Sequence, residues 1–119
     1  CLGHLDLIKR YAAEQGVSIR AEAEEELVRE ILRTLVERGK GLEINTSGLR
    51  QAVKETFPSR TILGWYLEEG GTILTVGSDA HRRQDVGAGF KEAKALALAL
   101  GFTYISCFRE RKLIQKKIE

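Results

Sequence analysis

The stretch that decides the fold is Ile73-Leu74-Thr75-Val76-Gly77-Ser78-Asp79-Ala80-His81. It joins an apolar run, typical of a buried strand, to a carboxylate and an imidazole two residues apart. In an extended chain, residues i and i+2 project to the same side, so Asp79 and His81 could reach one metal centre. The other histidine, His4, also follows an apolar start, Cys1-Leu2-Gly3. The sequence therefore predicts that strands deliver both histidines to the mouth of a barrel or of an open sheet.

Strand and helix patterns alternate along the rest of the chain. Apolar residues recur at helical spacing between residues 27 and 36, and Gly39 stands where such a helix ends. The predicted order is a strand to residue 4, a loop and short helix over 5–16, the helix ending at Gly39, a strand over 42–46, a helix over 58–69, a strand over 73–76, a helix over 86–100 and a strand over 103–108. The basic tail, 109–119, fits either a helix or a strand. Short connections and nearly continuous apolar strands are typical of βα units with a parallel sheet, so we expect the α/β class.

Composition indicates an ordinary globular protein with one core. The chain has 119 residues, 43% of them hydrophobic and 30% charged, and a net charge of +2. This near-neutral balance argues against a dedicated nucleic-acid surface, and no apolar run is long enough to span a membrane. Two cysteines make no disulfide framework, so we expect reduced thiols in a cytoplasmic protein, with Cys107 buried in its strand. Because the chain has no methionine and begins inside a strand pattern, we expect residues to precede Cys1.

Polar side chains gather where the predicted strands end. His4 ends the first strand, Asn45 with Glu43 nearby ends the second, and Asp79 and His81 end the third. In parallel α/β proteins, functional residues collect at the carboxyl ends of strands. Imidazole and carboxylate suit zinc, manganese or iron, and such ions can polarise a phosphoryl oxygen and activate water. A structural role is the common alternative for any one of these residues. Their shared position at strand ends is stronger evidence for a site than any one residue alone.

Two arginines lie just beyond strand ends. The guanidinium groups of Arg10 and Arg50 would suit a phosphate monoester, although either residue alone could be an ordinary surface arginine. The segment Gly87-Ala88-Gly89 precedes a predicted helix and could form a phosphate-binding turn. A close approach of the helix to the sheet explains these glycines equally well, because the full dinucleotide fingerprint is missing.

Four blocks of the sequence carry a family resemblance: Gly3-His4-Leu5-Asp6-Leu7-Ile8-Lys9-Arg10-Tyr11, Glu43-Ile44-Asn45-Thr46-Ser47-Gly48, Pro58-Ser59 and Gly77-Ser78-Asp79-Ala80-His81. In this order they resemble the C-terminal half of a histidinol-phosphatase of the polymerase-and-histidinol-phosphatase superfamily. The SDAH block marks the superfamily, and the GHLD and EINTSG blocks point to the histidinol-phosphatase branch.

The resemblance implies a fold, a reaction and roles for seven residues. Residues 1–119 would form the C-terminal part of a single domain, a distorted seven-stranded TIM-like βα barrel with a trinuclear metal centre at its mouth. The implied reaction is the hydrolysis of L-histidinol phosphate to L-histidinol and phosphate, in histidine biosynthesis. The implied metal ligands are His4, Asp79 and His81, and the implied substrate-binding residues are Arg10, Arg50, Glu43 and Asn45.

The chain also departs from the family pattern. Family members carry an N-terminal His-x-His pair, further histidines and a bridging Glu, which are absent here, and three protein ligands cannot build a trinuclear centre. A half barrel leaves open sheet edges, so we expect pairing with the missing half or with a second copy. Two other functions stay open: a non-enzymatic assembly or interaction module, and an exonuclease or phosphodiesterase domain of the superfamily, which the near-neutral charge makes less favoured.

Overall fold

The computed structural model describes residues 1–119, in which two helices are followed by alternating strands and helices and then by a terminal hairpin. The helices and strands are α1 (Ile8–Glu14), α2 (Glu25–Glu37), β1 (Leu42–Asn45), α3 (Arg60–Glu68), β2 (Leu74–Gly77), α4 (Phe90–Leu100), β3 (Tyr104–Arg109) and β4 (Lys112–Lys117). Short 3₁₀ turns lie at Ala21–Glu24, Ser47–Arg50 and Arg83–Asp85. No helix combines the length and apolar character that crossing a bilayer requires.

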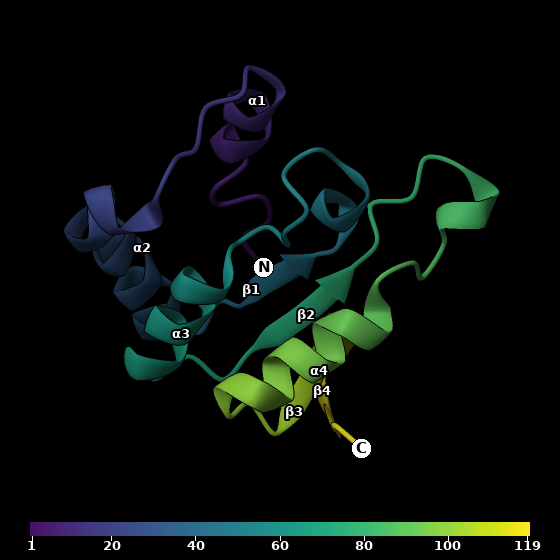
Figure 1. Cartoon of the computed structure of the whole chain (residues 1–119). Helices are drawn as coiled ribbons and strands as arrows, with labels where there is room; N and C mark the ends of the chain where they lie inside the picture. The colour runs from purple at the N-terminus through teal and green to yellow at the C-terminus, as the bar shows by residue number, and fades with distance from the viewer.

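Strands β1 and β2 lie side by side in parallel at the centre of the molecule (Figure 1). Their register pairs Leu42 with Leu74 and Asn45 with Gly77, and Leu2 extends the sheet by a parallel bridge to Leu42. Alternation along β1 sends Leu42 and Ile44 to one face and Glu43 and Asn45 to the other. Leu42, Ile44 and Asn45 are buried and Glu43 is partly buried, so both faces of β1 are covered, as expected, and one of them carries polar side chains.

The apolar face of this sheet packs against α2, α3 and α4. Helix α2 presents Leu32, which is fully buried, and its chain turns away through Gly39 at φ +60°. Helix α4 presents two small buried residues, Ala93 and Ala97, so its axis can approach the sheet closely. The core consists of Leu32, Leu42, Ile44, Ile62, Leu63, Trp65, Tyr66, Leu74, Ala93, Ala97, Phe102 and Ile118. Trp65 and Tyr66 belong to it, as the sequence predicts, and burial of each large side chain contributes about 1.5–3 kcal/mol.

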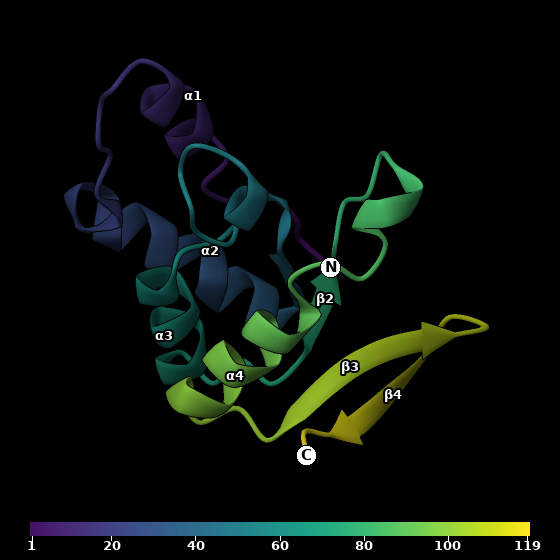
Figure 2. The same ribbon diagram turned by 45° about the vertical axis from the view of Figure 1, so that its right-hand side comes forward.

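The last two strands form a separate sheet. Strands β3 and β4 pair antiparallel, from Tyr104 with Lys117 to Arg109 with Lys112, and the hairpin reaches out from the body (Figure 2). The strand expected over 103–108 is present as β3, which is hydrogen-bonded to β4 and not to β1 or β2, and the tail forms a strand as well. Every residue of β4 is exposed. The hairpin also contacts the body: β3 lies against β2, Ile105 and Ile118 pack on the core, and Gln115 Nε2 donates to the Thr72 carbonyl at 3.0 Å.

Two smaller expectations also need correction. Helix α4 begins at Phe90, not at residue 86, because Gly87 and Gly89 take left-handed φ values of +75° and +78° that a helix cannot include. Cys107 is exposed, not buried, because side chains alternate along β3 and Cys107 faces away from the buried side that Ser106 occupies. What the structure shows is a mixed α/β fold with a parallel sheet. The seven-stranded barrel stays a prediction.

Candidate functional site

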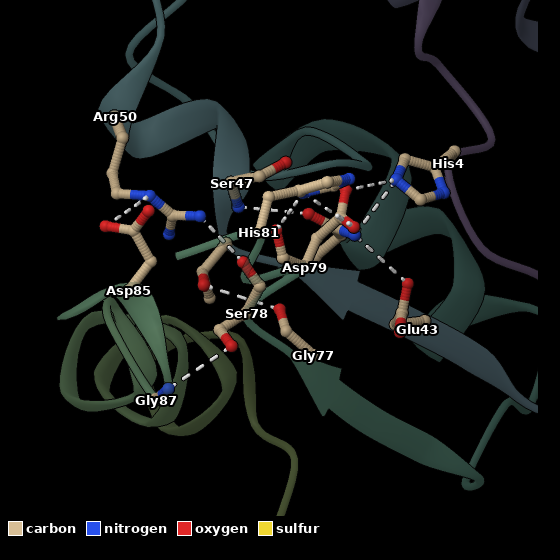
Figure 3. A network of polar contacts seen from close by, with 12 residues as sticks. His4, Glu43, Ser47, Arg50, Gly77, Ser78, Asp79, His81, Asp85 and Gly87 are labelled. Atoms are coloured by element: carbon tan, nitrogen blue, oxygen red, sulfur yellow. Dashed lines mark hydrogen bonds and ion pairs between the residues drawn. The ribbon is translucent and has the colours of Figure 1, made fainter. Parts of the chain in front are cut away.

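The polar face of β1 and the carboxyl end of β2 meet at one edge of the sheet (Figure 3). Glu43 and Asn45 lie on this face, and Gly77 ends β2 opposite Asn45. A side chain at position 77 would collide with the Glu43 carboxylate, which comes closest to Gly77 through Oε1. His4 reaches the same place from the segment that Leu2 attaches to β1. The topology thus brings together the ends of three chain segments, as the sequence predicts.

Asn45 is the buried centre of this cluster, with 1% of its surface exposed. Its Oδ1 accepts the Ser47 backbone N–H at 3.0 Å, and this contact fixes which end of the amide faces the cluster. Nδ2 then points to His4 Nε2 at 3.0 Å and donates to Glu43 Oε2 at 3.4 Å. Asn45 is therefore a donor toward the histidine in this arrangement.

His4 and Asp79 form the closest contact between the predicted metal ligands. His4 Nε2 lies 3.1 Å from Asp79 Oδ2 and is also the atom that Asn45 approaches. One ring nitrogen cannot donate to a carboxylate and accept from an amide at the same time. When His4 donates, its hydrogen bond holds the pKa of the Asp79 carboxyl below the usual range, which keeps it ionised. When Nε2 carries no proton, its single lone pair either accepts the Asn45 N–H or can bind a cation that the Asp79 carboxylate also contacts.

His81 is the outermost member of the group. Its side chain is 86% exposed, and Nδ1 lies 3.0 Å from the Asp79 carbonyl oxygen and 3.9 Å from Asp79 Oδ1. His4 and Asp79 have left-handed φ values of +56° and +48°, uncommon for residues other than glycine. Such backbone strain clusters at functional sites, where the surrounding structure maintains it.

These donors fit part of a metal site but not a complete one. The chemistry is suitable, since an imidazole and an ionised carboxylate converge to 3.1 Å. However, no group of three or more His, Cys, Asp or Glu side chains is arranged to hold a metal ion in this chain. A trinuclear centre therefore does not fit residues 1–119 alone.

The loop that carries Asp79 and His81 is tied down by residues that follow β1. Arg50 Nη2 donates to the Ser78 carbonyl at 2.8 Å, and Arg50 Nε lies 3.7 Å from Asp85 Oδ1. Thr46, fully buried, donates through Oγ1 to the Ala88 carbonyl at 2.5 Å. Arg50 thus stands beside the candidate metal ligands, and the role of Thr46 was not predicted because a Thr after a strand gives no distinctive signal.

Arg10 lies outside this network. Its Nε pairs with Glu14 Oε1 at 3.2 Å within α1, and its guanidinium lies over the Tyr11 ring at 5.6 Å. Of the seven predicted residues, six share contacts around Asp79 or the loop that bears it, and Arg10 does not.

Comparison with known proteins identifies relatives over almost the whole chain. A probable histidinol-phosphatase of Thermotoga maritima is 36% identical over 117 residues, which are 98% of this chain and 47% of that protein. A histidinol-phosphatase of Lactococcus lactis is 31% identical over 97% of this chain and 42% of its own length. The crystal structure of the Lactococcus lactis histidinol phosphate phosphatase, a complex with zinc, L-histidinol and phosphate, has a TM-score of 0.65 at 27% identity, over 81% of this chain and 36% of that one. No protein-family model matches the chain.

The fold and the cluster at the strand ends thus define an α/β protein with polar side chains gathered at the carboxyl ends of its parallel strands. More narrowly, the chain is homologous to the histidinol-phosphatases, which confirms the resemblance carried by its four sequence blocks. The chain spans less than half the length of the relatives named above, a match consistent with their C-terminal half.

Proposed function

We propose that this chain forms part of the active site of a metal-dependent phosphomonoesterase that hydrolyses L-histidinol phosphate to L-histidinol and phosphate. The observation that carries this proposal is the convergence of His4, Asn45 and Asp79 at the carboxyl end of a parallel sheet. The zinc, L-histidinol and phosphate in the complex of the Lactococcus lactis relative support the reaction class.

The proposed metal ligands are His4, Asp79 and His81. The Ser47 N–H orients the Asn45 amide beside the His4 imidazole, and the loop anchored by Arg50 holds Asp79. Zinc, manganese or iron bound there would lower the pKa of water and neutralise charge that develops on the phosphoryl oxygens. Because this chain supplies too few donors for a trinuclear centre, the other ligands would come from the part of the relatives that it does not span.

Arginines and the polar face of β1 would hold the substrate. Arg50 gives one N–H to the Ser78 carbonyl, and a guanidinium has five, so several are left for a phosphate. Arg10 would reach the phosphate from α1 after leaving its exposed pair with Glu14, which is a weak interaction. Glu43, partly buried beside Asn45, would meet the amine or imidazole of histidinol.

A chimera tests this proposal. This chain would replace the matched residues of the Thermotoga maritima relative, and phosphate release from L-histidinol phosphate would be measured with zinc or manganese present. We expect turnover, and His81→Ala in the chimera should abolish it and lower the bound metal. A folded, metal-loaded chimera without turnover would overturn the proposal.

A second candidate function is an assembly module, and the exposed apolar surface favours it. Val86 is 75% exposed and Phe108 52%, and no three-donor metal site is present. In this alternative, residues 1–119 are a portion of a single domain that pairs with the remaining half or with a second copy. Sedimentation of the isolated chain is the test: a monodisperse, well-folded monomer would contradict self-association.

A further inference from the structure

Lys9 is the one charged residue in the buried set of this chain, with 7% of its surface exposed. Its ammonium group uses all three donors: Nζ lies 2.7 Å from the Thr56 carbonyl, 2.9 Å from Asp6 Oδ2 and 3.1 Å from Glu55 Oε2. It also lies 5.2 Å from the centre of the Phe57 ring. A lysine is almost never buried unless it is paired, so this arrangement calls for an explanation.

The carboxylate of Asp6 depends on Lys9. Asp6 is 13% exposed, its Oδ2 accepts the Ser59 backbone N–H at 2.8 Å, and its Oδ1 is buried without a partner. Lys9 is thus the main compensation for this negative charge. Together the two side chains join the turn that begins at His4 to the loop over residues 55–59.

That loop leads back to the candidate site by two contacts. Phe57 exchanges both backbone hydrogen bonds with Asn45, at 2.8 and 2.9 Å, and Asn45 in turn points at His4. The Phe57 ring also lies beside the His4 imidazole, with 6.3 Å between ring centroids. The ammonium group of Lys9 therefore joins the turn that begins at His4 to the loop that places the Phe57 ring beside the His4 imidazole.

We propose that Lys9 and Asp6 form a positioning pair that sets the place of the His4 imidazole. Neither side chain touches His4 directly, and the effect passes through the turn that begins at His4 and through Phe57. Partners that orient a metal ligand typically account for about 10–100-fold in metal affinity. The metal part of this inference rests on the proposed function, whereas the geometry of His4 does not.

The test compares Lys9→Met with Lys91→Met, the same chemical change at an exposed position of α4. In the 119-residue chain, nuclear Overhauser contacts between the His4 and Phe57 rings report the geometry, and titration with zinc alone reports the affinity. We expect Lys9→Met to lose the ring contacts and to bind zinc at least about tenfold more weakly. Lys91→Met should match the wild-type chain in both measurements.

Asp6→Asn is the second variant, because it keeps the shape of the side chain and an acceptor for the Ser59 N–H. We expect it to weaken the ring contacts less than Lys9→Met does. The double variant, Asp6→Asn with Lys9→Met, should recover part of the ring contacts that Lys9→Met loses, since no buried carboxylate is then left uncompensated. The inference would be overturned if a folded Lys9→Met chain kept the ring contacts and the zinc affinity of the wild-type chain. If Lys9→Met does not fold, the inference would be overturned by an Asp6→Asn chain that keeps the ring contacts. If the wild-type chain binds no zinc while Lys9→Met still loses the ring contacts, the proposed function fails and the positioning role stands.

Discussion

Two glycines of one turn, Gly87 and Gly89, should respond very differently to the same substitution. Both have left-handed φ values, +75° and +78°, so alanine at either costs about 1–2 kcal/mol in backbone conformation. A Cβ at Gly87 meets nothing within 4 Å, whereas a Cβ at Gly89 would lie 2.8 Å from Thr46 Cβ and 2.9 Å from Leu49 Cδ1. Thr46 is fully buried and cannot move aside freely. Overpacking of this kind adds about 1–3 kcal/mol, so Gly89→Ala should cost about 2–5 kcal/mol in total.

Urea unfolding of the two variants measures the difference, with Gly87→Ala as the matched control. We expect the free energy of unfolding to fall by at least 1 kcal/mol more, roughly, for Gly89→Ala, with an unchanged denaturant slope. Equal losses in the two variants would refute the close approach of the turn to Thr46.

Three further predictions concern the core and the substrate. Burial raises the pKa of Tyr66 above its ordinary value of 10.0, and the neutral hydroxyl donates to the Ile73 carbonyl at 3.1 Å. Ionisation of Tyr66 thus favours the unfolded chain. The stability that the neutral hydroxyl contributes is complete below about pH 10 and is lost as the pH rises through the folded-state pKa of Tyr66. Tyr66→Phe should therefore flatten the fall in melting temperature at alkaline pH. Leu32→Ala should lower the free energy of unfolding in urea by about 2–5 kcal/mol, because Leu32 is fully buried. Leu27 is 56% exposed, so Leu27→Ala should lower it by less than about 0.5 kcal/mol, and similar losses in the two variants would contradict the assigned core. In the chimera, Arg10→Ala should mainly raise KM for L-histidinol phosphate, and an unchanged KM would remove Arg10 from the phosphate site.

Local periodicity was sufficient to predict the central elements. The helical spacing that ends at Gly39 and the apolar run before Gly77 predict α2 and β2, because each pattern is complete within one short segment. The hairpin could not be predicted in the same way. Its turn, Glu110-Arg111, takes left-handed φ values of +52° and +64° without the Asn or Gly that usually announces such a turn. An apolar strand followed by a lysine-rich one gives no other sign of antiparallel pairing.

The candidate site was predictable to the extent that topology determines it. Parallel strands bring their carboxyl ends to one edge, so the proximity of His4 and Asp79 follows from the strand pattern. The burial of Lys9 does not follow from the strand pattern, because a lysine near the start of an amphipathic helix is expected to be solvated. Its partners, at Thr56 and Glu55, lie more than forty residues away in a loop whose path no local pattern reveals.

The bridge at Leu2 has a consequence for how the molecule holds together. The segment that ends in His4 joins the sheet through two backbone hydrogen bonds, Leu2 N–H to the Gly41 carbonyl and Glu43 N–H to the Leu2 carbonyl. His4 and Asp79 are 75 positions apart in the chain. An ion held by both would act as a clasp between the first and the last strand of the parallel sheet, and would resist the peeling of the first strand from its neighbour. Binding of the ion and attachment of the first strand to the sheet would then be coupled.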